Sequence, residues 1–177
     1  DFSGGVTNGK YPSGGISLTY TNSKLYGMTE QGGSNPISSL GGTIFSLDVT
    51  NASSPVFEII HSFANGLGAA YNYDGGQPLG SLLYNNGYFY GMTQFGGLPN
   101  QGTIFRFNPN LTPPYDYSKL YDFGGIKGAY PRGSLTMGPD GKLYGMTTYG
   151  GSNDGYVGNG VIFSIDDNLT IRNKCCY

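Results

Sequence analysis

Charged side chains are scarce in this chain. They make up 11% of its 177 residues, with nine lysines and arginines against eleven acids and a formal net charge of −2. Nucleic-acid-binding domains carry a basic surface, so this balance predicts no nucleic-acid partner. No apolar run approaches the roughly 20 residues of a membrane-spanning helix, and we expect no membrane span. The chain opens on Asp1-Phe2 without a methionine, which is typical of a mature or excised segment.

Residues that bind metals or form disulfides are also few. The chain has one histidine, no tryptophan and two cysteines, and these cysteines are adjacent at Cys175 and Cys176. A zinc site of the histidine and cysteine type needs about four separated ligands, so we expect no metal and no cofactor. Three interpretations of the cysteine pair stay open: two thiols in a terminal strand, a link to a neighbouring chain, or a strained vicinal disulfide.

Acidic residues show no catalytic pattern. A glycosidase needs two carboxylates held about 5–9.5 Å apart, and nothing in the sequence marks such a pair. The oxygen-rich segments 72–76 and 152–155 lack the spaced acids and closing glutamate of an EF-hand loop. We interpret them as turns. His61 fills a position held by Tyr121 and Tyr177 elsewhere in the chain, which indicates a structural role. We therefore predict that the protein is not an enzyme.

Glycine and aromatic residues are abundant. There are 32 glycines, 16 tyrosines and 10 phenylalanines, whereas average glycine usage is about 7%. Disordered segments are poor in aromatic residues, so the chain is expected to fold. This composition predicts many short strands joined by tight turns, with almost no helix.

One series of motifs occurs three times. A Tyr-Gly-Met-Thr segment is followed by a Gly-Gly pair and then by a Thr/Val-Ile-Phe segment, and the central tyrosines are Tyr26, Tyr90 and Tyr144. They are spaced by 64 and 54 residues, as their numbers show. Such a period indicates one supersecondary unit repeated along the chain. We predict one repeat domain over 1–177, with repeats at about 3–63, 64–123 and 124–177, the last completed by residues 1–2.

Each repeat contains signals for four antiparallel strands. The first is expected at 12–18, 78–82 and 131–135, and Asn86-Gly87 and Asp140-Gly141 predict tight hairpin turns before the second. Four short strands per repeat is the unit of a β-propeller blade. The fold class is therefore all-β, with three four-stranded antiparallel blade-like repeats in a β-propeller or propeller-like array. The glycine of Tyr-Gly-Met is expected in the strand nearest the propeller axis. A linear β-solenoid-like stack is the alternative.

Two sets of residues are candidate sites. The sequons at Asn51, Asn110 and Asn168 all follow the third strand of a repeat, so N-glycosylation would decorate one face of the array. Aromatic residues in Gly/Asn-rich connections could contact a sugar ligand or pack between blades, and both interpretations stay open. These aromatic residues include Tyr73, Phe95, Tyr130 and Tyr149.

The order of motifs resembles the GloVer tandem repeats of choice-of-anchor, secreted and surface proteins, which are often bacterial. The resemblance covers nearly the whole chain, although the family commonly has threonine where this chain has Met28, Met92 and Met146. It implies an extracellular, propeller-like repeat array and no catalytic residues.

Three blades are fewer than the four to eight of a typical propeller. We therefore expect partners, either copies of the chain or adjoining repeats of a longer chain. The leading hypothesis is a non-catalytic extracellular structural repeat protein that assembles with copies of itself into a filament, ring or surface array. The alternative is a carbohydrate-binding lectin of β-propeller type, with glycans as partners.

Overall fold

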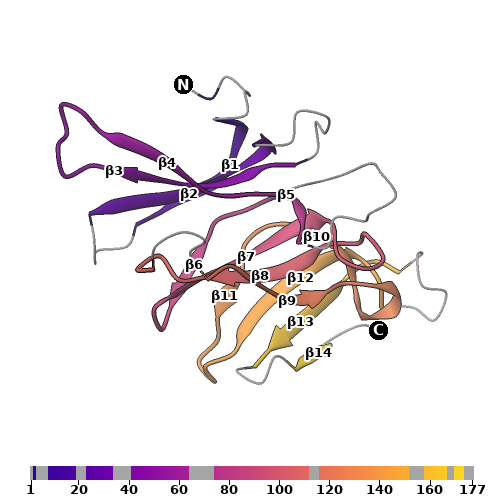
Figure 1. Ribbon diagram of the computed structural model, residues 1–177. Helices are drawn as coiled ribbons and strands as arrows, with labels where there is room; N and C mark the ends of the chain where they lie inside the picture. Colours follow the sequence, from indigo (N-terminus) through magenta and orange to yellow (C-terminus); the bar gives the residue numbers. More distant parts are fainter. Residues whose placement is uncertain are drawn as a thin grey trace.

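Strands form nearly all of the regular structure. The computed structural model describes residues 2, 8–18, 23–33, 41–63, 74–111, 116–151, 158–166 and 170–173. Within these ranges the helical element is one 3₁₀ turn, η1, Gly125–Lys127. The strands form three antiparallel sheets, one of four strands and two of five, and none of them closes on itself (Figure 1). The all-β prediction with blade-like repeats is confirmed. No helix in the described part of the chain is long and apolar enough to cross a membrane.

Each sheet is built from one continuous stretch of chain, and we call the three sheets blades 1, 2 and 3. Blade 1 contains β1 (Gly9–Leu18), β2 (Lys24–Gly32), β3 (Thr43–Asp48) and β4 (Val56–Ser62). Blade 2 contains β5 (Gly76–Pro78), β6 (Leu83–Asn85), β7 (Tyr88–Phe95), β8 (Thr103–Phe107) and β9 (Ser118–Asp122). Blade 3 contains β10 (Ala129–Pro131), β11 (Thr136–Met137), β12 (Leu143–Tyr149), β13 (Val161–Ile165) and β14 (Ile171–Asn173). Strand order follows chain order in every blade.

The Tyr-Gly-Met-Thr motif occupies the second strand of each blade, where it is paired on both sides. The motif glycine thus lies in an interior strand of its sheet, and its position relative to a propeller axis stays a prediction. Gly91 pairs with Phe105, and a Cβ on Gly91 would lie 2.4 Å from that ring. Gly27 and Gly145 lie in the same way against Phe45 and Phe163. The glycine is needed because the phenylalanine of the third strand lies over it.

The first strand is interrupted in two of the three blades, so the predicted continuous strands at 78–82 and 131–135 were also wrong. Blade 2 has β5 and β6 in its place, and blade 3 has β10 and β11. Both breaks fall on segments where neighbouring blades approach each other closely. A Cβ on Gly14 would lie 1.9 Å from the carbonyl oxygen of Gly80, and a Cβ on Gly80 would lie 2.1 Å from that of Gly133. The crowded backbone therefore lies at the first strand.

Polar bonds run along this line of glycines. The amide of Gly15 donates to Oγ of Ser81 at 2.6 Å, and the amide of Ser81 donates to Oγ of Ser134 at 2.8 Å. Backbone bonds between blades add to them: the amide of Gln77 donates to the carbonyl of Gly41, and that of Tyr130 to the carbonyl of Gln101. Each blade is thus bonded to the next through the first strand of the later blade.

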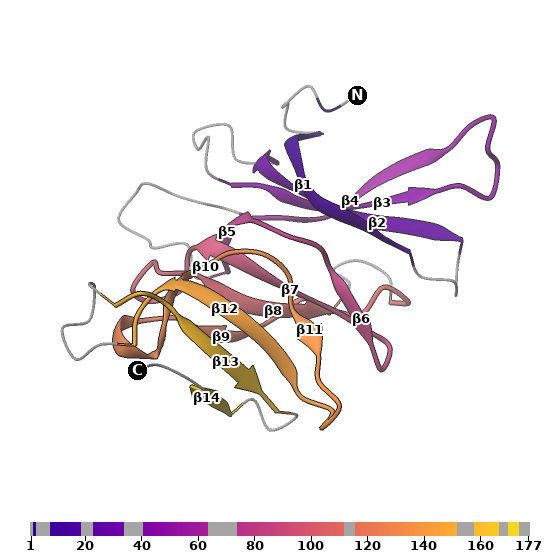
Figure 2. The same cartoon turned by 180° about the vertical axis from the view of Figure 1, so that it is seen from behind.

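Two apolar cores lie between the blades, with blade 2 in the middle (Figures 1 and 2). We call the face of a blade that contacts the following blade its forward face, and the face that contacts the preceding blade its backward face. The forward face of blade 1 and the backward face of blade 2 make the first core: Tyr26, Met28, Ile44, Ile60 and Phe63 pack with Leu82, Phe89, Phe105 and Phe107. The same faces of blades 2 and 3 make the second: Met92, Ile104 and Phe123 pack with Leu135, Leu143, Phe163 and Ile165. Burying a side chain of this size contributes about 1.5–3 kcal/mol, so these interfaces hold the molecule together.

Candidate functional site: an interblade pocket and two open blade faces

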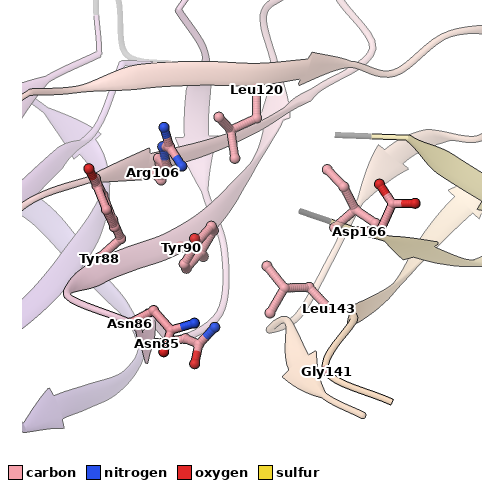
Figure 3. A pocket seen from close by; sticks show the side chains of 10 residues that line it. Asn85, Asn86, Tyr88, Tyr90, Arg106, Leu120, Gly141, Leu143 and Asp166 are labelled. Atoms are coloured by element: carbon pink, nitrogen blue, oxygen red, sulfur yellow. The ribbon is translucent and has the colours of Figure 1, made fainter. Parts of the chain in front are cut away.

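A pocket of about 200 Å³ opens between blades 2 and 3 (Figure 3). Blade 2 supplies its polar wall from the β6–β7 hairpin and β8, and blade 3 supplies residues from the turn before β12 and the end of β13. The lining residues are Asn85, Asn86, Tyr88, Tyr90, Arg106, Leu120, Gly141, Leu143, Ile165 and Asp166.

The pocket results from two smaller side chains in blade 3. In the first interface Tyr26 packs on Phe89 and Phe107, with ring centroids 4.7 and 6.2 Å away, and is 1% exposed. Tyr90 holds the same register in blade 2, but the equivalent pair opposite it is Leu143 and Ile165. Two aliphatic residues fill less space than two phenylalanine rings, so Tyr90 stays half-buried beside an open pocket.

Arg106 gives the pocket a fixed positive charge. It pairs with Tyr90 across the sheet, at the register where Ser46 pairs with Tyr26 and Ser164 with Tyr144. Its guanidinium carbon lies 4.5 Å from the centre of the Tyr88 ring, within the range of a cation–π contact. Its Nε is buried without a hydrogen-bond partner, and Arg106 has no ion pair with any residue in the described ranges.

Oxygen and amide groups complete the pocket. The Asn86-Gly87 turn, with φ values of 47° and 82°, is the tight hairpin predicted from the sequence. It places the amides of Asn85 and Asn86 beside Tyr90, with Asp166 and Leu143 across the pocket (Figure 3). Oδ1 of Asp166 accepts a bond from the amide of Thr170 at 2.9 Å. The pocket therefore combines one cation, two amides and an apolar side, with Asp166 at its edge, and this combination suits a small polar ligand.

Sequence reasoning missed this pocket, although a signal was present. Tyr88 stands where the other repeats have Lys24 and Lys142, and Arg106 stands where they have serine. Both departures fall in repeat 2 and in adjacent strands. Comparing the repeats position by position would have indicated a special site there.

Three of the four predicted ligand-contact aromatics lie together. Tyr130 contacts Phe95 at 5.6 Å and Tyr149 at 5.9 Å between ring centroids, both edge to face. Phe95 and Tyr130 are half-buried, whereas Tyr149 is exposed. These contacts pack β7, β10 and β12 against one another. Tyr73 lies outside the described residues.

The predicted glycosylation sites lie in equivalent turns. Asn51 and Asn110 are both exposed, just after β3 and β8. Oδ1 of Asn51 accepts a bond from the amide of Ser53, and the amide of Asn110 donates to Oδ1 of Asn108. Asn168 and the cysteines Cys175 and Cys176 lie outside the described residues.

His61 joins blades 1 and 2. Its ring stacks on Tyr117 at 3.9 Å with an interplanar angle of 2°, and its Nε2 lies 3.0 Å from Oδ2 of Asp74. The hydroxyl of Tyr117 donates to the carbonyl of Asp74 at 2.6 Å. Burial, and then the charges of Asp74 and Asp122, raise the pKa of Tyr117 well above its usual value. These contacts give His61 a structural role.

The forward face of blade 3 is open. Met146 is 60% exposed and Ile162 is 45% exposed. In blades 1 and 2 the equivalent methionines, Met28 and Met92, are each 2% exposed, and the equivalent isoleucines are fully buried at Ile44 and Ile104. The face that the following blade covers in the first two repeats thus lies bare in the third.

The backward face of blade 1 is only partly covered. Phe2 packs on Phe45 with ring centroids 5.3 Å apart and a 56° angle. Phe63 packs on Phe105 at 5.4 Å and 58°, and Phe123 packs on Phe163 at 5.1 Å and 62°. Phe63 and Phe123 each follow the last strand of a blade and contact the next blade. Phe2 makes the same contact with blade 1. Next to it Phe57 is 37% exposed.

The fold and these faces define a class of protein: an all-β array of tandem blade-like repeats in which each repeat packs on the next. The chain belongs to the Gloeobacter/Verrucomicrobia repeat family, whose sequence model matches residues 1–173. This match confirms the resemblance to the GloVer repeats.

Comparison with solved structures supports the fold alone. The chain is similar to a puromycin-hydrolyzing peptidase of Mycobacterium tuberculosis, with a TM-score of 0.52 and 12% sequence identity. The match covers 96% of this chain but 23% of the peptidase chain. A search of curated proteins found no match.

Proposed function

We propose that this repeat protein is a non-catalytic structural protein that assembles with copies of itself. The forward face of blade 3 of one copy packs on the backward face of blade 1 of the next. The observation that carries the proposal is the exposure of Met146, which is 60% against 2% for Met28 and Met92.

The internal interfaces provide the template for this contact. The chain builds the same forward-to-backward interface twice, each time with a methionine and an isoleucine from the forward face. Met146 and Ile162 hold these positions in blade 3, where no blade built from the described residues covers them. Each side chain that becomes buried contributes about 1.5–3 kcal/mol, which favours association.

Blade 1 carries a matching surface. Phe57 stacks on Phe45 at 5.4 Å and 27°, as Tyr117 stacks on Phe105 at 5.5 Å and 28°. In blade 2 the preceding blade covers this aromatic pair through the His61 ring. On blade 1 the equivalent residue, Phe57, remains exposed. Blade 3 of another copy could therefore cover Phe57 as blade 1 covers Tyr117.

The contact joins two different surfaces of each copy. Heterologous contacts of this kind produce a ring when the rotation per copy closes, and a filament when it does not. Both forms are consistent with the array that we propose.

We place the protein outside the cell. The resemblance to secreted and surface repeat proteins motivates this location, and the exposed sequons at Asn51 and Asn110 are compatible with it. Detection of the protein in a secreted or surface fraction of its source cells would support the proposal, and retention inside intact cells would contradict it.

Sedimentation equilibrium on the full chain tests the assembly. The wild-type protein is expected to associate as concentration rises. The double variant M146K/I162K places two charges on the open face and should weaken association by at least tenfold, because buried unpaired charges are costly. L111K is the control, since Leu111 is exposed in the turn after β8 of blade 2 and belongs to neither open face. A wild-type protein that stays monomeric at the highest soluble concentration would contradict the proposal.

The second candidate is carbohydrate binding of the propeller-lectin type. It is favoured by the pocket between blades 2 and 3, where tyrosines, amides and charged groups surround a space suited to one small polar ligand. A glycan array tests this candidate. Absence of binding to all glycans, together with an unchanged spectrum on titration with free sugars, would count against it.

A further inference from the structure

We infer that the pocket between blades 2 and 3 binds a carboxylated sugar residue of the uronic-acid type, and that Arg106 holds its carboxylate. The inference rests on the second candidate function and is independent of self-assembly. It specifies the chemical class of the ligand and the residue that selects it.

Arg106 is the first reason. Its Nε is buried without a hydrogen bond, and a buried polar group without a partner is costly. A guanidinium presents several donors in a rigid planar fork, which matches the two oxygens of a carboxylate. Because Nε itself is enclosed, a carboxylate in the pocket would bind the terminal nitrogens of this fork.

Contact with Tyr88 preorganises the guanidinium of Arg106 as a hydrogen-bond donor. The contact of 4.5 Å between the guanidinium and the Tyr88 ring limits the movement of the long arginine side chain. A side chain that is already ordered loses less conformational freedom when the ligand binds. Both residues lie on the same wall of the pocket (Figure 3).

The amide groups favour a sugar over a simple anion. Asp166 lines only the edge of the pocket: its carboxylate points away from Tyr90, and Oδ1 accepts a bond from the amide of Thr170 (Figure 3). Sugar hydroxyls can both donate to and accept from the side-chain amides of Asn85 and Asn86, whereas sulfate can only accept. The ligand is therefore expected to carry one acidic group at the Arg106 side and hydroxyl groups at the side of Asn85 and Asn86.

The remaining surface suits the C–H face of a sugar ring. Leu120, Leu143 and Ile165 supply apolar contact, and Tyr90 is half-buried beside them. The volume of about 200 Å³ is below the range of about 300–1,000 Å³ that drug-sized ligands occupy. One sugar residue is the size that we expect the pocket to accept.

The test compares two probes that differ at one carbon. Methyl glucuronide and methyl glucoside share the ring and its hydroxyls, and the first carries a carboxylate in place of the exocyclic alcohol. NMR titration of the full chain should show methyl glucuronide binding at least tenfold more tightly. Sodium sulfate at the same ionic strength is the third probe and should bind more weakly than methyl glucuronide.

Three variants locate the site. R106S introduces the serine of the other two repeats and should lower affinity for methyl glucuronide at least tenfold. I165F introduces the larger residue of blade 2, should fill the pocket and should abolish binding. R132S is the control, because Arg132 lies outside the pocket lining and should leave affinity unchanged. Thermal unfolding of each variant confirms folding, and I165F keeps the test valid if R106S is unstable.

The possible results separate the two hypotheses. Equal affinity for both sugars, or unchanged affinity in R106S, would overturn the role of Arg106 while leaving carbohydrate binding in place. Sulfate binding as tight as glucuronide binding would indicate a general anion site and overturn the inference. No binding of either sugar would overturn the inference, whereas the second candidate function is overturned only when the glycan array is silent as well.

Discussion

At the scale of single residues, glycine has two different structural roles in this chain. Gly91 in the second strand leaves room for the Phe105 ring within one blade. Gly80 leaves room for the backbone of Gly133 in the neighbouring blade. The first role concerns packing within one sheet, and the second concerns the contact between two blades. Both glycines occur at equivalent positions of the repeats, so the sequence alone does not distinguish the two roles.

The substitution Gly80→Ala tests the role at the contact between blades. Its Cβ would lie 2.1 Å from a backbone oxygen and the residue has a φ of 96°, so we expect a loss of about 3 kcal/mol from combined overpacking and strain. Gly133→Ala is a matched control, since Gly133 has a φ of 88° and open space around its Cβ. It should cost about 1 kcal/mol. Urea unfolding at a concentration where the chain is monomeric measures both, and equal losses would contradict the close contact.

At the scale of elements, the hairpin turns are the most predictable parts. Asn86-Gly87 forms its turn because both residues adopt positive φ, which these residue types accept at low cost. The first strand was predicted less well. Its Pro-x-Gly segment lies against a neighbouring blade, and the first strand is broken at Gly80 and Gly133, whereas β1 shows only a shift of register between Ser13 and Ser17.

The turn at Asp140 is stabilised in a pH-dependent way. Its carboxylate accepts bonds from Nζ of Lys142 at 2.8 Å and from the hydroxyl of Tyr144 at 2.9 Å. The bond from Lys142, followed by that from Tyr144, lowers the pKa of Asp140 to about 2. The folded pKa is thus below the unfolded one, so the stabilisation is present above about pH 4 and is lost as pH falls through 2.

NMR titration should give a midpoint near pH 2 for Asp140. The variant D140N should reduce the pH dependence of unfolding between pH 4 and 2, because the titrating carboxylate is absent. D116N removes a carboxylate from another exposed turn and serves as the control. A midpoint near 4 would contradict the bond to Lys142.

At the scale of the whole molecule, the two ends of the array differ from its middle. Blade 2 is covered on both faces, whereas blade 3 exposes Met146 and Ile162, and blade 1 exposes Phe57. Such apolar surface at the ends of a repeat array marks an interaction site when it continues an existing interface. The proposed assembly therefore extends along the direction in which the repeats already stack.

Gly133 provides a second test of assembly. In the interior of the array the equivalent Gly80 lies against the backbone of the following blade. The variant G133A should therefore weaken self-association at least tenfold while the single chain stays folded, because its Cβ would meet the first blade of the next copy. Sedimentation equilibrium and circular dichroism measure the two effects. Undiminished association of a folded G133A protein would exclude the predicted docking geometry.

The sequence by itself determined the all-β class, the three repeats and the hairpin turns. These depend on local properties, namely the backbone preferences of glycine and asparagine and motifs that recur along one chain. Only the tertiary structure decided which of the three motif methionines is exposed, why the glycine of the second strand is needed, and where the pocket lies. Those features depend on side chains that meet across blades: Tyr26 meets two phenylalanines, while Tyr90 meets Leu143 and Ile165. The free volume between two blades depends on side chains that are far apart in the chain. A local sequence pattern therefore cannot predict it.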